Sequence, residues 1–247
     1  MKKILFILFI LFCITGTSQT LNDCSTCSTN IIKPEQIMDL SIDEIRYLTN
    51  DLFARKGYKF KSALIDYHFS TKEWYHRIDD NAKIEYNETE KQNIKLFQDR
   101  TTELKLDREK LLAELKAFKS AFLQKDKELL RSRFNYTIEK DFEDNDYFLH
   151  ENFKYFSEVL NRLELEQINW LKHQGHYKVI VDNLSETIGY EISIKENQIY
   201  FEYDYDMGSE EVTDDLYLSD YYVEFSHFWS FEWKNGKLKF IKYDMAG

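Results

Sequence analysis

The spacing of apolar residues changes once along the chain, from a helical period to a strand period. In the N-terminal part, residues such as Ile42, Ile45 and Leu48 recur every three or four positions, which is typical of amphipathic helices. Towards the C-terminus, residues such as Tyr190 and Ile192 alternate with polar ones, which is typical of half-buried strands. This order predicts an α+β fold: a small helical N-terminal domain, followed by helices packed on an antiparallel sheet that can curl into a cone.

Local signals give the expected bounds of the helices. Ser41 and Glu44 have the spacing of a capping box and predict the start of the first helix. Gly57 can take the left-handed conformation that ends it. A short helix is expected over residues 62–69, and Asn87 predicts the start of a third.

The third helical pattern is long. It continues to Phe122, and Asp107 could cap a new helix inside it, so one long helix and two shorter ones are both open. Further helices are expected over residues 126–134 and 147–163.

The C-terminal part is rich in β-branched and aromatic residues, which favour strands. Asn235 and Gly236 predict a tight type I′ hairpin between the last two strands. The strands are expected over residues 177–181, 187–194, 198–205, 221–233 and 237–243. In the aromatic strand, Phe225, Trp229 and Phe231 should share one face, and that face is expected to form core or to line a pocket.

The first 18 residues have the three parts of a secretory signal peptide. Two lysines are followed by an apolar run over residues 4–14, and small residues precede a cleavage position after Ser18. The run is too short for a membrane span, which needs about 20 residues. Cys13 lies inside the run after a bulky residue, so we do not expect lipidation. The protein is therefore expected to be secreted, or periplasmic in the cell envelope, without a stable membrane span after cleavage.

Cys24 and Cys27 would be the two cysteines of the mature chain. They are expected to form a local disulfide in an oxidising compartment, with redox chemistry or half a metal site as the alternatives. We therefore divide the chain into a signal peptide 1–18, a flexible tail 19–38 with Cys24 and Cys27, a helical domain 39–106 and an α+β domain 107–247.

The formal net charge of the chain is −11. Residues 200–224 contain nine Asp or Glu residues and no Lys or Arg. This acidic balance argues against nucleic acid as a partner.

One N-terminal segment contains a series of short motifs. These are Phe53 to Gly57, then Trp74 and Tyr75, and finally Asn87 and later residues. By the order and spacing of these motifs, the segment from Leu40 to about Leu104 resembles the YARHG family. The resemblance implies a small helical domain in an exported bacterial protein. Phe53 and Lys56 stand where the family has Tyr and His, so a role that needs an imidazole there does not carry over.

The same segment contains the candidate ligand-binding residues. Basic residues gather around Gly57 and two aromatic residues follow, so the set is Arg55, Lys56, Lys59, Lys61, Trp74 and Tyr75. Aromatic faces stack on sugar rings and Arg binds anions in a bidentate way, which favours recognition of a cell-wall polymer. The alternative is a small core of Phe53, Phe60, Phe69 and Trp74, with Arg55 bound to a carboxylate.

We expect no catalytic residue, no metal and no cofactor. Residues 204–208 begin like a calcium loop but have Gly208 at a ligand position. The C-terminal half is weakly similar to NTF2-like domains, which include both enzymes and binding modules. The sequence thus favours an exported non-catalytic binding protein of the bacterial cell envelope, with a cell-wall polymer or an envelope protein as partner. The alternatives are a secreted hydrolase or modifying enzyme with its site in the C-terminal domain, and a structural interaction protein.

Overall fold

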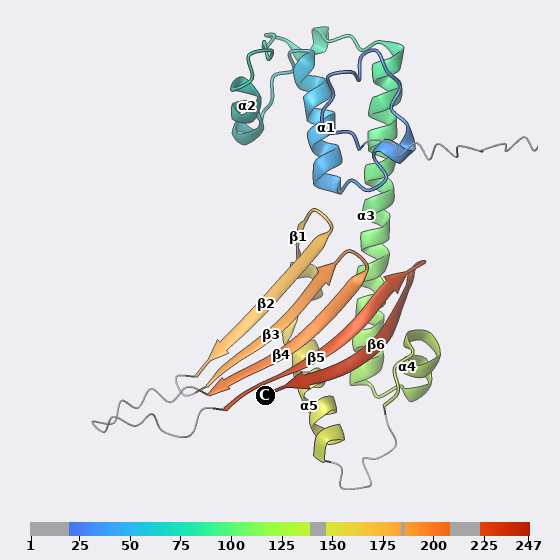
Figure 1. The fold of residues 1–247 in the computed structure, drawn as a ribbon, viewed down its shortest axis with the longest axis vertical. Helices are drawn as coiled ribbons and strands as arrows, with labels where there is room; N and C mark the ends of the chain where they lie inside the picture. The colour runs from blue at the N-terminus through green and yellow to red at the C-terminus, as the bar shows by residue number, and fades with distance from the viewer. Residues whose placement is uncertain (1–19, 139–146, 184–185, 208–222) are drawn as a thin grey trace, which may run out of the picture. The chain divides into compact units, whose positions relative to one another are not determined.

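The chain divides into two compact units. The computed structural model describes residues 20–138, 147–183, 186–207 and 223–247, and the predicted signal peptide lies outside them. The first unit contains residues 1–40 and 45–98, and the second contains residues 41–44 and 99–247. Figure 1 shows the α+β fold, with helices in the first unit and both helices and a sheet in the second.

The first unit is built from three helices and the segment before them. The elements are η1 (Pro34–Gln36), α1 (Ile42–Arg55), α2 (Ala63–Ser70), η2 (Asn81–Lys83) and the first part of α3 (Glu88–Leu123). The capping box predicted for α1 is present, because Glu44 accepts the backbone N–H of Ser41 and the Ser41 hydroxyl accepts that of Glu44. Asn87 and Glu90 form the same reciprocal pair at the start of α3.

The segment predicted as a flexible tail over residues 19–38 is packed in the structure from residue 21 on, so that prediction is wrong for most of its length. Cys24 and Cys27 lie at disulfide distance and are 1% and 0% exposed. Asn93 of α3 holds the segment. Its side-chain amide donates to the backbone oxygens of Cys27 and Asn30 and accepts the N–H of Ile32. Polar composition alone misses this anchor, because a buried amide satisfies the backbone of a segment far away in sequence.

The second unit has a six-stranded antiparallel sheet in sequence order. Its helices are the rest of α3, α4 (Lys127–Phe134), α5 (Tyr147–Arg162) and η3 (Leu165–Gln167). Its strands are β1 (Asn169–Leu171), β2 (Gln174–Asp182), β3 (Thr187–Lys195), β4 (Gln198–Met207), β5 (Val223–Lys234) and β6 (Lys237–Ala246). Asn235 and Gly236 both have positive φ, as the predicted type I′ turn requires.

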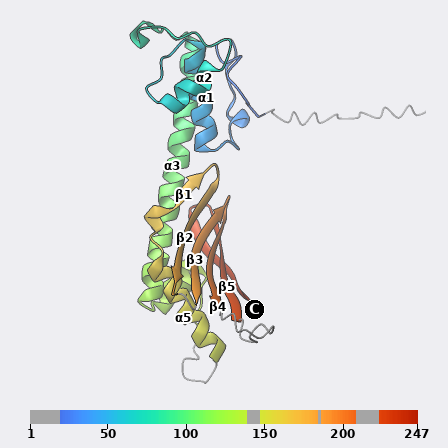
Figure 2. The ribbon, with the colours of Figure 1, turned by 90° about the vertical axis from the view of Figure 1, so that its left-hand side faces the viewer.

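The core of the second unit lies between one face of the sheet and the helices. Figures 1 and 2 show α5 and the C-terminal part of α3 on this face, while no helix of the described residues covers the other face. Trp229 of β5 stacks on Phe156 of α5 with ring centroids 4.3 Å apart. Phe118 of α3 meets Phe231 edge-on at 4.8 Å. All four side chains are fully buried, so the aromatic strand forms core on the predicted face.

The structure decides one question that the sequence left open and adds one element that was not expected. The long helical pattern is one helix, and Asp107 does not start a new one: its carboxylate accepts the indole N–H of Trp233 at 3.1 Å. The short strand β1 was not predicted, because three residues are too few to show a period.

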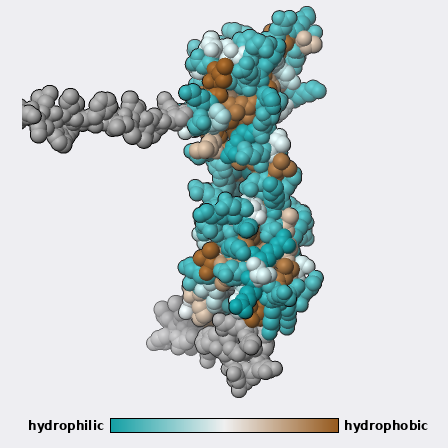
Figure 3. Space-filling model, turned by 90° about the vertical axis from the view of Figure 1, so that its right-hand side faces the viewer, coloured by the Kyte–Doolittle hydropathy of each residue, from teal (hydrophilic) through white to brown (hydrophobic). Residues whose placement is uncertain are grey.

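The surface shown in Figure 3 is mostly hydrophilic with separate apolar areas. No helix among the described residues combines the length and the apolar character needed to cross a bilayer.

The anchoring role of Asn93 leads to a testable expectation. Asn93→Ala leaves two backbone oxygens and one N–H of the disulfide segment without their partner, and a buried unsatisfied group costs about 1–3 kcal/mol. We expect amide hydrogen exchange over residues 24–32 to accelerate at least about fivefold in this variant. Gln92→Ala, on the exposed side of α3, should leave the exchange unchanged. Equal protection in all three proteins would show that Asn93 does not hold the segment.

Candidate functional site

The turn after α1 fixes the position of the predicted basic cluster. Gly57 has a φ of +78°, its N–H donates to Ala54, and the N–H of Tyr58 donates to Phe53. This pair of bonds is the Schellman motif at a helix end. A Cβ at Gly57 would lie 2.5 Å from the backbone oxygen of His76, so only glycine fits here.

The Lys56 side chain forms an ion pair within the first unit. Its ammonium lies 3.0 Å from the carboxylate of Glu90, whose side chain is 3% exposed. Glu90 also accepts the N–H of Asn87 at the start of α3. Lys56 therefore compensates a buried charge, and a ligand would have to compete with that pair.

Arg55 lies between a buried carboxylate and an exposed indole. Its Nε donates to Asp51 at 3.1 Å, and the same Asp51 oxygen accepts the backbone N–H of Cys24. The Arg55 guanidinium carbon stands 4.3 Å from the centroid of the Trp74 ring. This is a cation–π contact, so the structure brings together two of the predicted site residues.

The other predicted residues lie differently. Tyr75 is 7% exposed and its hydroxyl donates to the backbone oxygen of Tyr58 at 2.7 Å. Burial, and then the nearby Asp66, raises the pKa of the Tyr75 hydroxyl, so it serves as a buried donor. Lys59 and Lys61 are exposed, and the backbone of Lys59 exchanges hydrogen bonds with the side chain of Asn81.

The structure adds exposed residues that the sequence interpretation missed. We call Tyr47, Leu64, Tyr67, His68 and Trp74 the aromatic patch. Leu64 is 79% exposed, Tyr67 70% and Trp74 38%. Leu64, Tyr67 and His68 share one face of α2, since they are three and four residues apart. The sequence contained a sign of this exposure. The short helix α2 has several apolar or aromatic residues, and only one of them, Phe69, is buried.

Phe69 joins the parts of the aromatic patch. Its buried ring contacts Tyr47, His68 and Trp74 at centroid distances of 6.1, 5.0 and 6.1 Å. Tyr47 also meets His68 edge-on at 5.5 Å. Of the alternative small core, Phe69 and Phe60 pack together with Ala54 and Tyr75. Phe53 lies against Tyr58 and Tyr86 instead, and Trp74 is partly exposed. The aromatic patch can therefore offer ring edges and faces to a ligand above the buried ring of Phe69.

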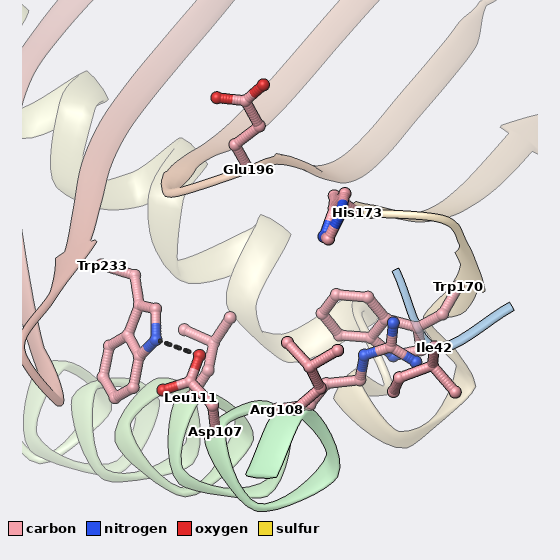
Figure 4. A pocket seen from close by; sticks show the side chains of 9 residues that line it. Ile42, Asp107, Arg108, Leu111, Trp170, His173, Glu196 and Trp233 are labelled. Atoms are coloured by element: carbon pink, nitrogen blue, oxygen red, sulfur yellow. Dashed lines mark hydrogen bonds between the residues drawn. The ribbon is translucent and has the colours of Figure 1, made fainter. Parts of the chain in front are cut away.

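The second unit has a small hollow between α3 and the β1–β2 and β3–β4 turns, drawn in Figure 4. Its volume is about 80 Å³, room for several water molecules. Arg108 stacks on the Trp170 ring at 4.3 Å and donates to the backbone oxygen of Lys172, and burial lowers its pKa. The Asp107 carboxylate accepts the indole N–H of Trp233. Two of the charged groups that line this hollow, Asp107 and Arg108, thus already have partners within the unit.

If the protein were an enzyme with its site in the C-terminal domain, the inner face of the sheet would be the place for the catalytic pocket. It contains a pair of titratable groups: His227 Nδ1 lies 2.5 Å from the Tyr243 hydroxyl. Tyr155 of α5 covers His227 with ring centroids 4.6 Å apart. No group of three or more His, Cys, Asp or Glu that could hold a metal ion occurs among the described residues. Side chains of α3 and α5 pack against this face of the sheet.

Burial sets the pH dependence of this pair. It lowers the pKa of His227, with a smaller opposing effect from Glu151, and raises the pKa of Tyr243 to about 12. The folded state therefore keeps His227 neutral where the unfolded chain, with a pKa of about 6.5, binds a proton. Stability from this group is complete above about pH 6.5 and is lost as the pH falls towards the lower folded value.

We expect the melting temperature to fall less between pH 7 and pH 5 in His227→Gln than in the unaltered chain. The measurement is thermal unfolding at both values, followed by near-UV circular dichroism. His76→Gln, which changes an exposed histidine, is the control and should keep the full dependence. If His227→Gln kept it too, His227 would not be the buried neutral group described above.

Comparison with known families confirms the resemblance of the N-terminal part. No curated protein and no solved structure matches the chain. Residues 23–101 match the sequence model of the family described as YARHG domain. The match begins before Cys24, so the disulfide segment is included in the family's pattern, and it supports a binding role outside the cytoplasm. The chain is thus similar to the YARHG domain over residues 23–101.

Proposed function

We propose that this is an exported, non-catalytic binding protein of the cell envelope, and that the aromatic patch of its YARHG-like unit contacts a cell-wall polymer. The single observation that carries the proposal is the exposure of several aromatic side chains around the buried ring of Phe69, with Arg55 beside Trp74. Aromatic rings offer large contact area at low entropy cost, and exposed apolar clusters mark interaction sites.

The chemistry of the aromatic patch suits a polymer of sugars with carboxylate groups. Tyr47, Tyr67 and Trp74 can stack on the apolar faces of sugar rings, and their polar atoms can bond hydroxyls. Arg55 places a cation beside Trp74, where it can approach a carboxylate while Asp51 holds its other side. An envelope protein is the other candidate partner, and the experiment below separates the two.

The alternative functions have less support. An enzyme with a site on the inner face of the sheet would need space that α5 and α3 occupy in the structure. A structural role of the acidic segment 200–224 depends largely on residues 208–222, which lie outside the described residues.

Binding is tested by sedimentation with isolated peptidoglycan. The chain from Gln19 on should co-sediment with it, and Tyr67→Ala combined with Trp74→Ala should weaken binding at least about fivefold, since each ring contact contributes about 0.5–1.5 kcal/mol. Ile241→Ala removes a side chain of the second unit that is 54% exposed and is the matched control. No sedimentation would rule out the wall polymer and leave an envelope protein as the partner to seek. Equal sedimentation of all variants would show that the polymer is bound elsewhere than at the aromatic patch.

Export is tested separately. We expect the protein recovered from outside the cytoplasm to begin at Gln19, with Cys24 and Cys27 oxidised. Intact-mass spectrometry before and after reduction and alkylation measures both. An intact N-terminus starting at Met1 in a cytoplasmic fraction would contradict the proposal.

A further inference from the structure

The two edges of the sheet are protected to different degrees. At β6, the Asn135 side chain donates to the backbone oxygen of Phe240, and the ammonium of Lys239 donates to Arg133. The pairing of β5 with β6 also has a bulge after Ser230. Covering, charge and bulges are the usual ways to keep a sheet edge from pairing with another chain.

The edge at β2 has less protection. β1 pairs only with Gln174–His176, through its three residues. From residue 177 to residue 182, β2 has a strand partner on the β3 side only, as far as the described residues show. Its register with β3 runs unbroken from Gln174 to Asp182, so no bulge turns this edge away. Figure 2 shows β2 at the margin of the sheet that faces the viewer.

Two backbone hydrogen bonds define which residues of β2 point to the open side. Asn183 donates to Glu186 at one end of the β2–β3 hairpin, and Glu196 donates to His173 at the other. Hydrogen-bonded pairs alternate in an antiparallel ladder, so the odd-numbered residues of β2 bond to β3. The N–H and C=O of Lys178 and Ile180 therefore point away from β3.

The side chains along this edge are self-complementary. Lys178, Ile180 and Asp182 are the exposed residues of this part of β2 and share the face away from α5, which no helix of the described residues covers. Ile180 is 62% exposed. If a second copy of this strand lies antiparallel beside the first, centred on Ile180, Lys178 of each copy faces Asp182 of the other. The two Ile180 side chains then face each other. Lys178 already contacts Glu191 at 3.4 Å, and its long stem can also reach across to a neighbouring strand.

We propose that this edge pairs with the same edge of a second copy of the chain, antiparallel and with the two-fold axis at Ile180. Ile180 exchanges both backbone hydrogen bonds with the partner's Ile180, and Lys178 faces the partner's Asp182. Opposite charges across a strand pair stabilise it and like charges oppose it. Lys178 thus disfavours unrelated strands, which lack the matching acid, and a second copy supplies that acid.

The interface is short, so the association should be weak. A few residues from each copy bury less than the roughly 800 Å² per partner of a standard interface. We expect dimers at about 100 µM protein and monomers at about 1 µM. This inference does not depend on polymer binding by the first unit.

Sedimentation-velocity analysis of the chain from Gln19 on, over this concentration range at physiological salt, is the test. Ile180→Pro removes the outward N–H but no bond to β3, so it should leave the sheet intact and weaken dimerisation at least about tenfold. Ile180→Glu, at a largely exposed position, provides a second variant with two like charges opposed. Circular dichroism checks that each variant is folded.

Charge reversal makes the test specific. Lys178→Asp alone should abolish the dimer by opposing two acids, and Lys178→Asp combined with Asp182→Lys should restore it. A monomer at all concentrations would overturn the proposal. A dimer that persists in a folded Ile180→Pro or Ile180→Glu variant would also overturn it, because the contact would then lie elsewhere.

Discussion

The arrangement of the first unit depends on the two hydrogen bonds that the buried carboxylate of Asp51 accepts. Asp51 is 1% exposed, yet it accepts the N–H of Cys24 and pairs with Arg55. A buried charge that keeps two donors is tolerated, while one that loses a partner is strongly destabilising. One side chain of α1 therefore fixes both the disulfide segment and the arginine beside Trp74.

This arrangement connects the framework of the unit to its candidate binding surface. The disulfide closes the short loop that contains the Cys24 N–H. Asp51 accepts this N–H and also binds Arg55. The Arg55 guanidinium in turn lies over the Trp74 indole ring. Glu90 and Asn93 act in the same manner on α3, where buried polar side chains satisfy Lys56 and the backbone around Cys27. Hydrogen bonds are directional. They therefore restrict the positions of the exposed rings and charges more closely than apolar packing would.

The second unit follows a different principle. Aromatic side chains on the inner face of the sheet pack against α5 and α3, and contacts such as Trp229 on Phe156 close the core. The two edges of the sheet differ from this packed face. The β6 edge is covered, whereas β2 retains backbone donors and acceptors.

Most of the fold could be predicted from the sequence because local signals agree with it. The capping pairs at Ser41 and Asn87, the glycine after α1 and the turn at Asn235 each specify a boundary through bonds between near neighbours. The positions of the candidate ligand-binding residues depended on contacts that the sequence does not show. Arg55 lies over the Trp74 ring, Tyr75 is buried and Lys56 is bound to Glu90.

The sequence by itself determined the α+β class, the order of helices and strands, and the YARHG-like segment. These follow from spacing, propensity and motif order, which need no distant contact. Only the tertiary structure decided that residues 21–38 are packed, that α3 is continuous through Asp107, and that Tyr47 and Tyr67 belong to an exposed aromatic patch. The physical reason is that burial and pairing depend on partners far away in sequence, such as Asn93 for the segment around Cys27 and Trp233 for Asp107.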